Sequence, residues 1–302
     1  MKVAACRYPL TAPRDFSAFA DKQRALLDEA KSAGAELVVL PEYLSMELAG
    51  MLDDATRSDP HASLRALQAL HVDWMALFSQ LAMALRLHIN AGSFMVEAGG
   101  GRFRNRSHLF APDGRHLWQD KLRLTAFEKR LGVIASGDAL KVFDVGGVRA
   151  GIAIGYDCEF PLPVRAQCGA GARLLLVPGA GAGVADASRL RVGCLARALE
   201  NRCFVAQAAM AGDASWSPWL GEGVGEAALI APMDVGLPHD GMVVETGAKR
   251  HWAIAELDFD ALEASRAVAE VANDRDWASQ YFPSIQRARL EAGPAPETKR
   301  VA

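Results

Sequence analysis

Apolar runs of strand character alternate with helical segments at the start of the chain, and this alternation constrains the fold more than any other feature. The run "KVAACRY" has the composition of a strand, and the next segment, residues 15–35, carries apolar residues at helical spacing and closes at Gly34. A second apolar run, "ELVVL", follows. A strand, a helix and a strand in this order predict a β-α-β unit, which places the chain in the α/β class.

The alternation continues through most of the remaining sequence. A long helical segment at 61–88 is followed by short apolar runs between Gly-rich and "PDG" turns, which are typical of hairpins, so we expect a mixed sheet. Another hairpin is predicted to turn at 146–147. Because no linker or composition break interrupts this pattern, we predict one domain over 1–290, with helices outside two sheets, and a polar tail over 291–302.

Composition and charge narrow the class of protein. The 302 residues are 51% hydrophobic and 23% charged, which suits a soluble protein with a large core. No run approaches the ~20 consecutive apolar residues of a membrane helix, and the start "MKVAACRYPL" lacks the long apolar segment of a secretory signal. The net charge is −3 and the basic residues are dispersed. We therefore expect a cytoplasmic protein that binds neither membranes nor nucleic acids.

Several common functional motifs are absent. The sequence has no GxSxG elbow, "GMVVETGAK" has the wrong spacing for a phosphate-binding loop, and "GAGAGV" lacks the last glycine of a dinucleotide motif. The seven histidines show no ligand spacing. The cysteines form an odd set without CxxC or Cys/His ligand spacing, and we expect free thiols in a reducing compartment: Cys6, Cys158, Cys168, Cys194 and Cys203.

Three segments carry candidate catalytic residues. In "ELVVLPEYL" the strand ends at Pro41, and Glu42 stands at its carboxyl edge, where α/β folds place functional groups; a solvated turn residue is the alternative. In "WQDKLRLTAFEKR", Lys121 and Glu128 lie among apolar neighbours, although a surface lysine with a buried stem would look the same. The segment "GIAIGYDCEFP" predicts a strand, a tight turn and a helix that begins at Pro161.

Together these parts suit thiol-dependent hydrolysis of an amide. In that chemistry a glutamate removes the thiol proton, and the thiolate attacks a carbonyl or nitrile carbon. A lysine ammonium then stabilises the oxyanion that forms. The sequence therefore predicts a glutamate–lysine site beside the turn of the third segment.

Four ordered segments resemble motifs of the carbon–nitrogen hydrolase, or nitrilase, superfamily. They are "LPEYL", "DKLRLTAFE", "YDCEFP" followed by "GARLLLVPGA", and "ARALENRCFVAQ". Their order and spacing agree with the family from about Lys2 to Asp258, and "DASWSPW" is similar to a little-characterised bacterial branch.

The resemblance implies a four-layer α-β-β-α sandwich with two mixed sheets, and a single carbon–nitrogen hydrolase domain. It implies a base at Glu42, an oxyanion lysine at Lys121, a supporting acid at Glu128 and an oxyanion N–H at Tyr156. It also implies a small amide or nitrile substrate, an amide being favoured, and neither metal nor organic cofactor. Assembly as a homodimer or larger homo-oligomer is expected through the outer helices, with apolar residues of "VRAQC" and "DFDALEASRAV" partly exposed in a lone subunit.

The nucleophile position departs from the family pattern. Family members carry a cysteine six residues before the proline, and counting back from Pro161 gives Gly155, which has no side chain. Three explanations remain open: a natural non-catalytic relative, a deliberate replacement, or a nucleophile relocated to Cys158. Relocation would move the attacking atom by several ångströms, although the following helix start could favour a thiolate there. The alternative function is a binding or regulatory protein that keeps the pocket.

The segment 212–223 is rich in Gly, Trp and Pro and is predicted to be a loop. Its two tryptophans, Trp216 and Trp219, are candidates for the mouth of the pocket. Packing against a partner subunit is an equal alternative for both.

Overall fold

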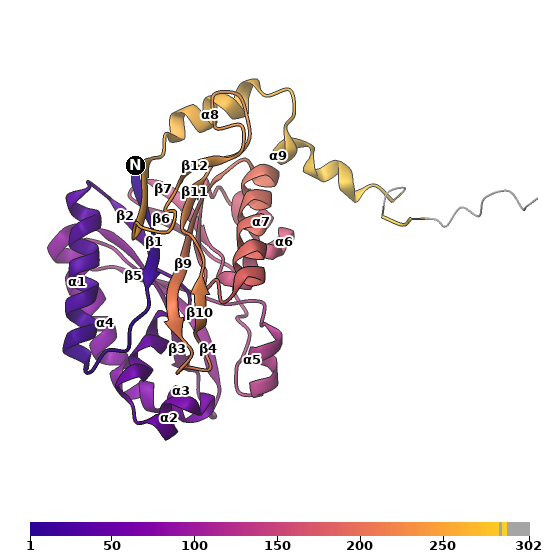
Figure 1. Ribbon diagram of the computed structural model, residues 1–302. Coiled ribbons are helices and arrows are strands. Elements are labelled where there is room, and N and C mark those ends of the chain that lie inside the picture. Colours follow the sequence, from indigo (N-terminus) through magenta and orange to yellow (C-terminus); the bar gives the residue numbers. More distant parts are fainter. Residues whose placement is uncertain (284–285, 289–302) are drawn as a thin grey trace, which may run out of the picture.

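The computed structural model describes residues 1–283 and 286–288, so the polar tail predicted at 291–302 and the domain end at 290 lie outside the described residues. Two mixed β-sheets lie between layers of helices, as Figure 1 shows. The first sheet has, in order across it, β13 (Trp252–Glu256), β1 (Lys2–Pro9), β2 (Leu37–Val39), β3 (His88–Glu97), β4 (Phe103–Phe110) and β5 (His116–Asp120). The second has β6 (Val142–Val145), β7 (Val148–Ile152), β8 (Leu174–Pro178), β9 (Phe204–Ala214), β11 (Ala228–Ile230) and β12 (Met242–Glu245).

The two sheets are joined along one line. Residues 7–9 of β1 pair in parallel with 209–211 of β9, and β10 (Gly221–Val224) pairs antiparallel with the far end of β9. Each sheet contains both parallel and antiparallel pairs, which confirms the predicted mixed sheets. Because β2 is parallel to β1, β1 to β9, and β9 to β8, strands β2 and β8 of the two sheets run in the same direction, and their carboxyl ends lie in the same region.

Helices cover the outer face of each sheet. In Figure 1, α1 and α4 lie on one side of the strands and α6 and α7 on the other. The helices are α1 (Phe16–Ser32), α2 (Asp54–Ser58), α3 (Pro60–Leu67), α4 (His71–Leu85), α5 (Ala126–Leu131), α6 (Pro161–Gly169), α7 (Val184–Asn201), α8 (Phe259–Val268) and α9 (Asn273–Asp276). The described residues also include the 3₁₀ segments η1 (Leu44–Met51), η2 (Gln68–Leu70), η3 (Gly155–Glu159) and η4 (Trp277–Tyr281).

The alternation of side chains along a strand builds the layers. In β1, Ala4 and Cys6 belong to the core between the first sheet and its helices, whereas Val3 and Ala5 belong to the core between the two sheets. A third core packs α6 and α7 on the second sheet. The predicted four-layer α-β-β-α sandwich is therefore confirmed.

The long helical segment predicted at 61–88 is interrupted. It forms α3, η2 and α4, and the last residues enter β3. In η2 the side chain of Gln68 donates a hydrogen bond to the carbonyl oxygen of Met95 at 2.8 Å and accepts one from the backbone N–H of Glu97 at 2.9 Å. This tie to β3 replaces the continuous helix that the apolar periodicity predicted.

The segment 212–223 is only partly a loop. Strand β9 continues to Ala214, and Gly221 begins β10 opposite it, so the predicted loop forms the tip of a hairpin. Sequence patterning missed this because the paired residues at the hairpin ends include Gly, Asp, Ala and Glu, which are poor strand formers. The hairpin carries Trp219 to the region where the strands of both sheets end.

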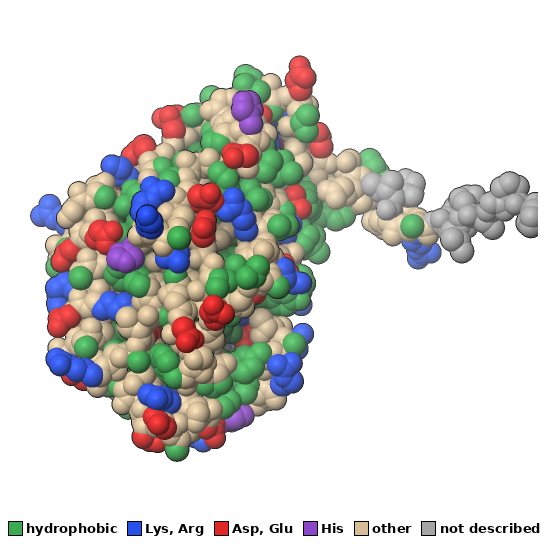
Figure 2. Space-filling model, viewed as in Figure 1, with side chains coloured by type: hydrophobic (Ala, Val, Ile, Leu, Met, Phe, Trp, Pro, Cys, Tyr) green, Lys and Arg blue, Asp and Glu red, His purple; other side chains and the backbone are tan. Residues whose placement is uncertain are grey.

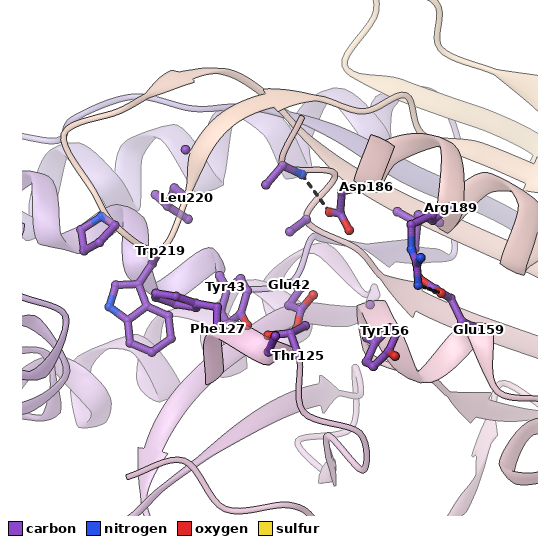
Figure 3. Close-up of a pocket in the computed structure, with 17 residues that line it drawn as sticks. Glu42, Tyr43, Thr125, Phe127, Tyr156, Glu159, Asp186, Arg189, Trp219 and Leu220 are labelled. Carbon is purple, nitrogen blue, oxygen red and sulfur yellow. Dashed lines mark hydrogen bonds and ion pairs between the residues drawn. The ribbon is translucent and has the colours of Figure 1, made fainter. Parts of the chain in front are cut away.

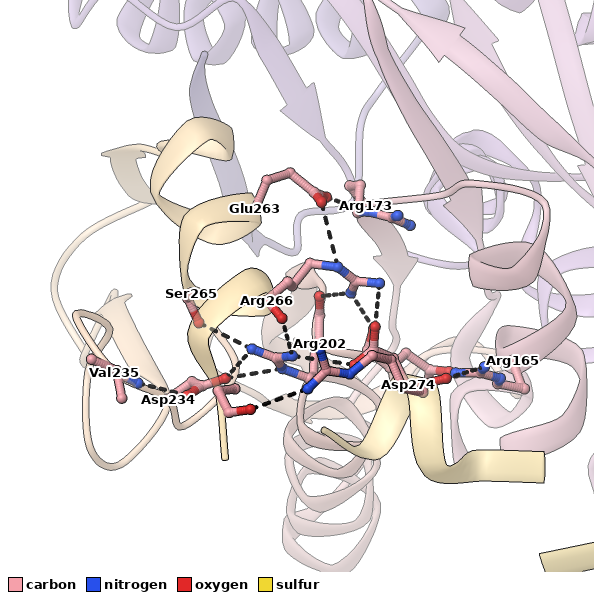
Figure 4. Close-up of polar contacts among 12 residues, drawn as sticks. Arg165, Arg173, Arg202, Asp234, Val235, Glu263, Ser265, Arg266 and Asp274 are labelled. Atoms are coloured by element: carbon pink, nitrogen blue, oxygen red, sulfur yellow. Dashed lines mark hydrogen bonds and ion pairs between the residues drawn. The ribbon is translucent and has the colours of Figure 1, made fainter. Parts of the chain in front are cut away.

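A polar cluster around the buried Arg202, shown in Figure 4, joins the end of α7 to α8 and α9. Arg202 follows α7 in the left-handed region, with φ of 51°, and its side chain is 2% exposed. It donates to Ser265 Oγ at 3.2 Å and to Asp274 Oδ1 at 3.3 Å. Arg266 donates in turn to the carbonyl oxygen of Arg202 at 2.8 Å. The ends of α7, α8 and α9 are thereby held together.

Acidic and basic side chains are interspersed on the face of the molecule that Figure 2 shows. Within residues 1–283 and 286–288, none of the helices combines the length and the hydrophobicity that a membrane crossing requires.

Candidate active site

Three chain segments meet at the floor of a pocket of about 520 Å³. Glu42 follows β2, Lys121 follows β5, and Gly155 begins η3 after β7. The backbone N–H of Glu42 donates to the carbonyl oxygen of Gly179, just beyond β8, at 3.3 Å. Glu42 thus lies where strands from both sheets end, as Figure 3 shows beside the other pocket residues.

Glu42, Lys121 and Glu128 form one buried cluster. Lys121 Nζ donates to Glu42 Oε1 at 2.7 Å and to Glu128 Oε2 at 2.9 Å. The three residues are 3%, 1% and 0% exposed, so neither alternative drawn from the sequence applies: Glu42 is no solvated turn residue and Lys121 no surface lysine. The structure brings the three predicted residues together, and their catalytic roles remain predictions.

Glu128 is held by its own helix. It is the third residue of α5, and Thr125, the residue that caps this helix, exchanges hydrogen bonds with it in a capping box. The backbone N–H of Thr125 donates to Glu128 Oε2 at 2.7 Å. The helix start therefore orients the carboxylate towards Lys121.

Two further residues complete the cluster, and sequence reasoning missed both. Asn105 Nδ2 donates to Glu42 Oε1 at 2.8 Å and to Glu128 Oε1 at 3.3 Å. The hydroxyl of Tyr43 donates to Glu128 Oε1 at 2.7 Å. A possible signal was the position of Asn105 in "FRNRSHLF", where alternation along the strand turns it towards the core.

The cluster holds one ammonium between two carboxylates. Burial raises the pKa of Glu42 to about 7, although Lys121 opposes the shift and Glu128 adds to it. Burial also opposes ionisation of Glu128, but Lys121 and the N–H of Thr125 hold its pKa below the ordinary value. Burial alone would lower the pKa of Lys121, yet the two carboxylates outweigh it and raise that pKa. Glu42 is therefore the carboxylate of the pair that can exchange a proton near neutrality.

Asp157 fixes the turn against the lysine segment, a role that the sequence analysis did not assign. It is 3% exposed and accepts hydrogen bonds from the backbone N–H groups of Leu122, Arg123 and Ile154, at 3.1, 2.6 and 3.4 Å. Burial raises the pKa of Asp157 to about 6, while these N–H groups oppose the shift. Its place in "YDCEFP" was the available signal.

Gly155 lies directly beside Glu42. Its φ is +46°, a backbone conformation that residues other than glycine rarely adopt. Gly155 is the first residue of η3 and not the last residue of a strand. A Cβ placed on Gly155 would lie 2.9 Å from Glu42 Cδ, with Oε2 nearer still. Oε1 is engaged by Lys121 and Asn105, and Oε2 accepts no hydrogen bond from the described residues. The free carboxylate oxygen therefore faces the position of the missing side chain.

Cys158 lies outside the pocket. It is fully buried in the core between the second sheet and α6 and α7, and its Sγ lies 4.0 Å from the carbonyl oxygen of Leu190. A Cβ on Gly193 of α7 would meet this Sγ at 3.0 Å. Tyr156, by contrast, lines the pocket and packs edge-on against Phe160. The thiol thus faces the helix layer and not Glu42.

Trp219 and Trp216 differ in position. Trp219 is 5% exposed, lines the pocket and packs edge-on against Phe127 at 5.2 Å. Trp216 is partly buried against the first core and is absent from the residues that line this pocket. Of the two candidates for the pocket mouth, the structure therefore places Trp219 in its wall.

The fold and the site define a class: an α-β-β-α sandwich with a buried glutamate–lysine–glutamate cluster on the floor of a pocket. A sequence model described as Carbon-nitrogen hydrolase matches residues 2–266, and the chain belongs to this family. The resemblance seen in the sequence is thereby confirmed.

Curated relatives include hydrolases and amidases. The chain is 26% identical over 277 residues to the probable hydrolase YhcX of Bacillus subtilis (strain 168), covering 91% of this chain and 53% of that protein, so it spans about half of that relative's length. It is 27% identical over 269 residues to the omega-amidase NIT2-B of Xenopus laevis, covering 84% of this chain and 88% of that protein.

Solved structures share the fold. Nit3 of Saccharomyces cerevisiae, a member of branch 10 of the nitrilase superfamily, superposes with a TM-score of 0.71 at 20% identity, over 90% of this chain and 94% of that one. An amidase from Nesterenkonia sp. AN1, solved after Michael addition of acrylamide at its active-site cysteine, gives 0.66 at 22% identity, over 92% of this chain and 99% of that one.

Replacing Lys121 by Met should destabilise the protein strongly. The change leaves Glu42 and Glu128 buried without their cation, and breaking a buried ion pair in this way costs about 3–5 kcal/mol. Urea unfolding monitored by circular dichroism measures the loss. Lys129→Met, an exposed change in the same segment, should stay within about 0.5 kcal/mol of the parent. A second change, Glu128→Gln, should recover part of the loss. A Lys121→Met protein as stable as Lys129→Met would contradict this account of the cluster.

Proposed function

We propose that the pocket binds small amides in the manner of a carbon–nitrogen hydrolase, and that Gly155 occupies the position of the attacking cysteine. One observation carries the proposal: the free Oε2 of Glu42 faces the place where a side chain at residue 155 would begin. Base and oxyanion donor are then in place, while the attacking atom is missing. The chain as it stands should therefore hydrolyse amides poorly or not at all.

With a thiol at residue 155, the chemistry follows from the neighbouring groups. Glu42 Oε2 takes the thiol proton, and the sulfur forms a bond to the amide carbon. The carbonyl electron pair moves to oxygen, where Lys121 and the backbone N–H of Tyr156 stabilise it. When the pair returns, the C–N bond breaks and ammonia leaves with the proton from Glu42. Glu42 then takes a proton from water, whose oxygen bonds to the thioester carbon; the C–S bond breaks, the acid is released, and the sulfur recovers the proton from Glu42.

The names of related proteins favour an amide over a nitrile as the ligand. NIT2-B of Xenopus laevis is an omega-amidase, and the Nesterenkonia protein is an amidase. A cofactor plays no part in the steps proposed here.

A second candidate function is a binding or regulatory protein that has kept the pocket and lost the reaction. The observation in its favour is that Cys158, the only cysteine in η3, is buried against α7 and does not line the pocket. A relocated nucleophile would need its sulfur within reach of both Glu42 and the substrate, and this geometry argues against it. The two functions share the pocket and differ only in turnover.

Gly155→Cys should raise ammonia release from butanamide at least about 100-fold, because general-base and nucleophilic catalysis become possible together. Gly155→Ala is the matched control, since it adds the same Cβ at positive φ without a thiol and should stay at the level of the parent. Both variants require Glu42 to rotate away from the new Cβ, so their stabilities are compared first.

The rate of Gly155→Cys should also fall as the pH is lowered through about 7, because Glu42 accepts a proton only when ionised and burial raises its pKa to about 7. If the parent turns over butanamide and loses this activity on Cys158→Ala, then the nucleophile lies at Cys158 and the assignment of Gly155 is wrong.

We further propose that the chain assembles as a homodimer or larger homo-oligomer through α6 and α7. Of the apolar residues of "VRAQC", Val164 and Cys168 are buried and the small Ala166 is exposed. Larger apolar side chains that stand exposed are Leu162 on α6 and Val192 on α7, at 62% and 65%. In the segment 258–268, the exposed apolar residues are Ala264, Ala267 and Val268, the last being 68% exposed.

Light scattering at micromolar concentration should therefore give at least twice the monomer mass of 32.3 kDa. Val192→Lys should shift the protein towards the monomer, because it places a charge in an apolar interface. Val72→Lys, an equally exposed change on α4 at the other side of the molecule, should not. A monomeric parent would rule out the proposed assembly.

A further inference from the structure

The pocket has two unlike walls on either side of Glu42. Figure 3 shows Trp219, Phe127 and Tyr43 on one side, and Asp186, Arg189 and Glu159 on the other. The reacting carbon of a bound amide must lie between them, beside Glu42 and Gly155. The two walls therefore determine which chemical groups are tolerated in the part of a ligand that extends beyond its amide group.

The first wall is apolar and aromatic. Trp219 packs edge-on on Phe127, and the rings of Trp219 and Tyr43 are 5.7 Å apart. Trp219 and Tyr43 are largely buried and Phe127 is partly buried, so the rings form a tightly packed apolar wall against which an aromatic ring of a ligand can lie in tilted contact. A pocket of about 520 Å³ also has room for a ligand well beyond the smallest amides.

The second wall offers no free cation. Arg189 faces Glu159 with two of its nitrogens, Nε lying 3.1 Å from Oε1 and Nη2 pairing with Oε2. Lys121 is engaged by Glu42 and Glu128 below the pocket floor. Each cation that the pocket region contributes from the described residues therefore already has a carboxylate partner.

Asp186 adds a negative charge to this wall. It lies in the first turn of α7, accepts a hydrogen bond from the backbone N–H of Ala182 at 3.0 Å, and forms no ion pair with any described residue. Its charge is also a minor contribution to the raised pKa of Glu42, after burial and Glu128. The positive end of α7 would attract an anion, but the carboxylate of Asp186 already occupies that place.

We propose that the pocket selects primary amides with a neutral, apolar acyl arm, that an aryl group on this arm packs on Trp219 and Phe127, and that Asp186 discriminates against an arm ending in a carboxylate. This inference rests on the proposed function, because it assumes that the amide group lies beside Glu42. Specificity would then come from both walls: the aromatic wall attracts an apolar arm, and the wall with Asp186 repels an anionic one.

Isothermal titration calorimetry on the unmodified chain tests the inference without any chemistry. The probes are 3-phenylpropanamide, butanamide and succinamate, the last two having the same number of carbon atoms. We expect 3-phenylpropanamide to bind most tightly and succinamate at least about tenfold more weakly than butanamide. Succinamate binding as tightly as butanamide, or no binding by any probe, would overturn the inference.

Three variants assign the preference to its residues. Asp186→Asn keeps an oxygen that accepts from the backbone N–H of Ala182, and it should reduce the difference in affinity between butanamide and succinamate. The control Asp73→Asn removes an exposed acid from the first turn of α4. It should leave the difference in affinity between the two probes as in the parent. Trp219→Leu should weaken 3-phenylpropanamide more than butanamide. Equal differences in affinity in the two Asp variants would remove Asp186 from the account.

These experiments test the selectivity and the proposed function separately. If Gly155→Cys turns over amides but prefers succinamate, the selectivity is wrong and the proposed function stands. If the probes bind in the expected order but Gly155→Cys shows no turnover, the proposed hydrolysis is wrong and the selectivity stands.

Discussion

The ammonium of Lys121 between two buried carboxylates is the interaction on which the site depends. Burying a charge is costly unless it is paired and hydrogen-bonded, so Glu42, Glu128 and Lys121 stabilise one another or none of them can stay ionised. Tyr43 and Asn105 donate to the other oxygen of Glu128, and Asn105 also donates to the Glu42 oxygen that Lys121 binds. The end of β2, the end of β5 and the start of α5 must therefore meet at one point, and the sandwich of two sheets brings them there.

The turn at Gly155 is coupled to this cluster through Asp157. Its carboxylate ties η3 to the backbone of the segment that carries Lys121, so Glu42, Lys121 and the turn form one unit. The contacts of this framework need no side chain at residue 155. A pocket can thus exist without an attacking atom at this residue, and the proposed binding and the proposed turnover are therefore separate questions for this chain.

Local patterns predicted much of this architecture, and tertiary contacts account for the rest. Period-two and helical spacing indicated most strands and helices. The segment around Glu42 could be found because it follows an apolar run, and the segment around Lys121 because it contains the apolar residues Leu122, Leu124 and Phe127. Local patterns could not predict three features: the contacts of Asn105, the burial of the Cys158 side chain, and the break of the helix at Gln68. Each depends on a partner far away in the sequence: Glu42, α7 and β3, respectively. Hairpin pairing at Gly221 was hidden because its residues are weak strand formers.

The central claim is that the site lacks only the atom at residue 155, and acrylamide labelling tests it most directly. Acrylamide carries an amide for the pocket and a double bond to which a thiol adds irreversibly. In Gly155→Cys, peptide mapping by mass spectrometry should find one adduct, on the peptide that contains residue 155, and butanamide should slow its formation. The parent, with its cysteines buried, should remain unlabelled under the same conditions. Labelling of Cys158 in the parent, or labelling of the variant that butanamide does not slow, would contradict the account.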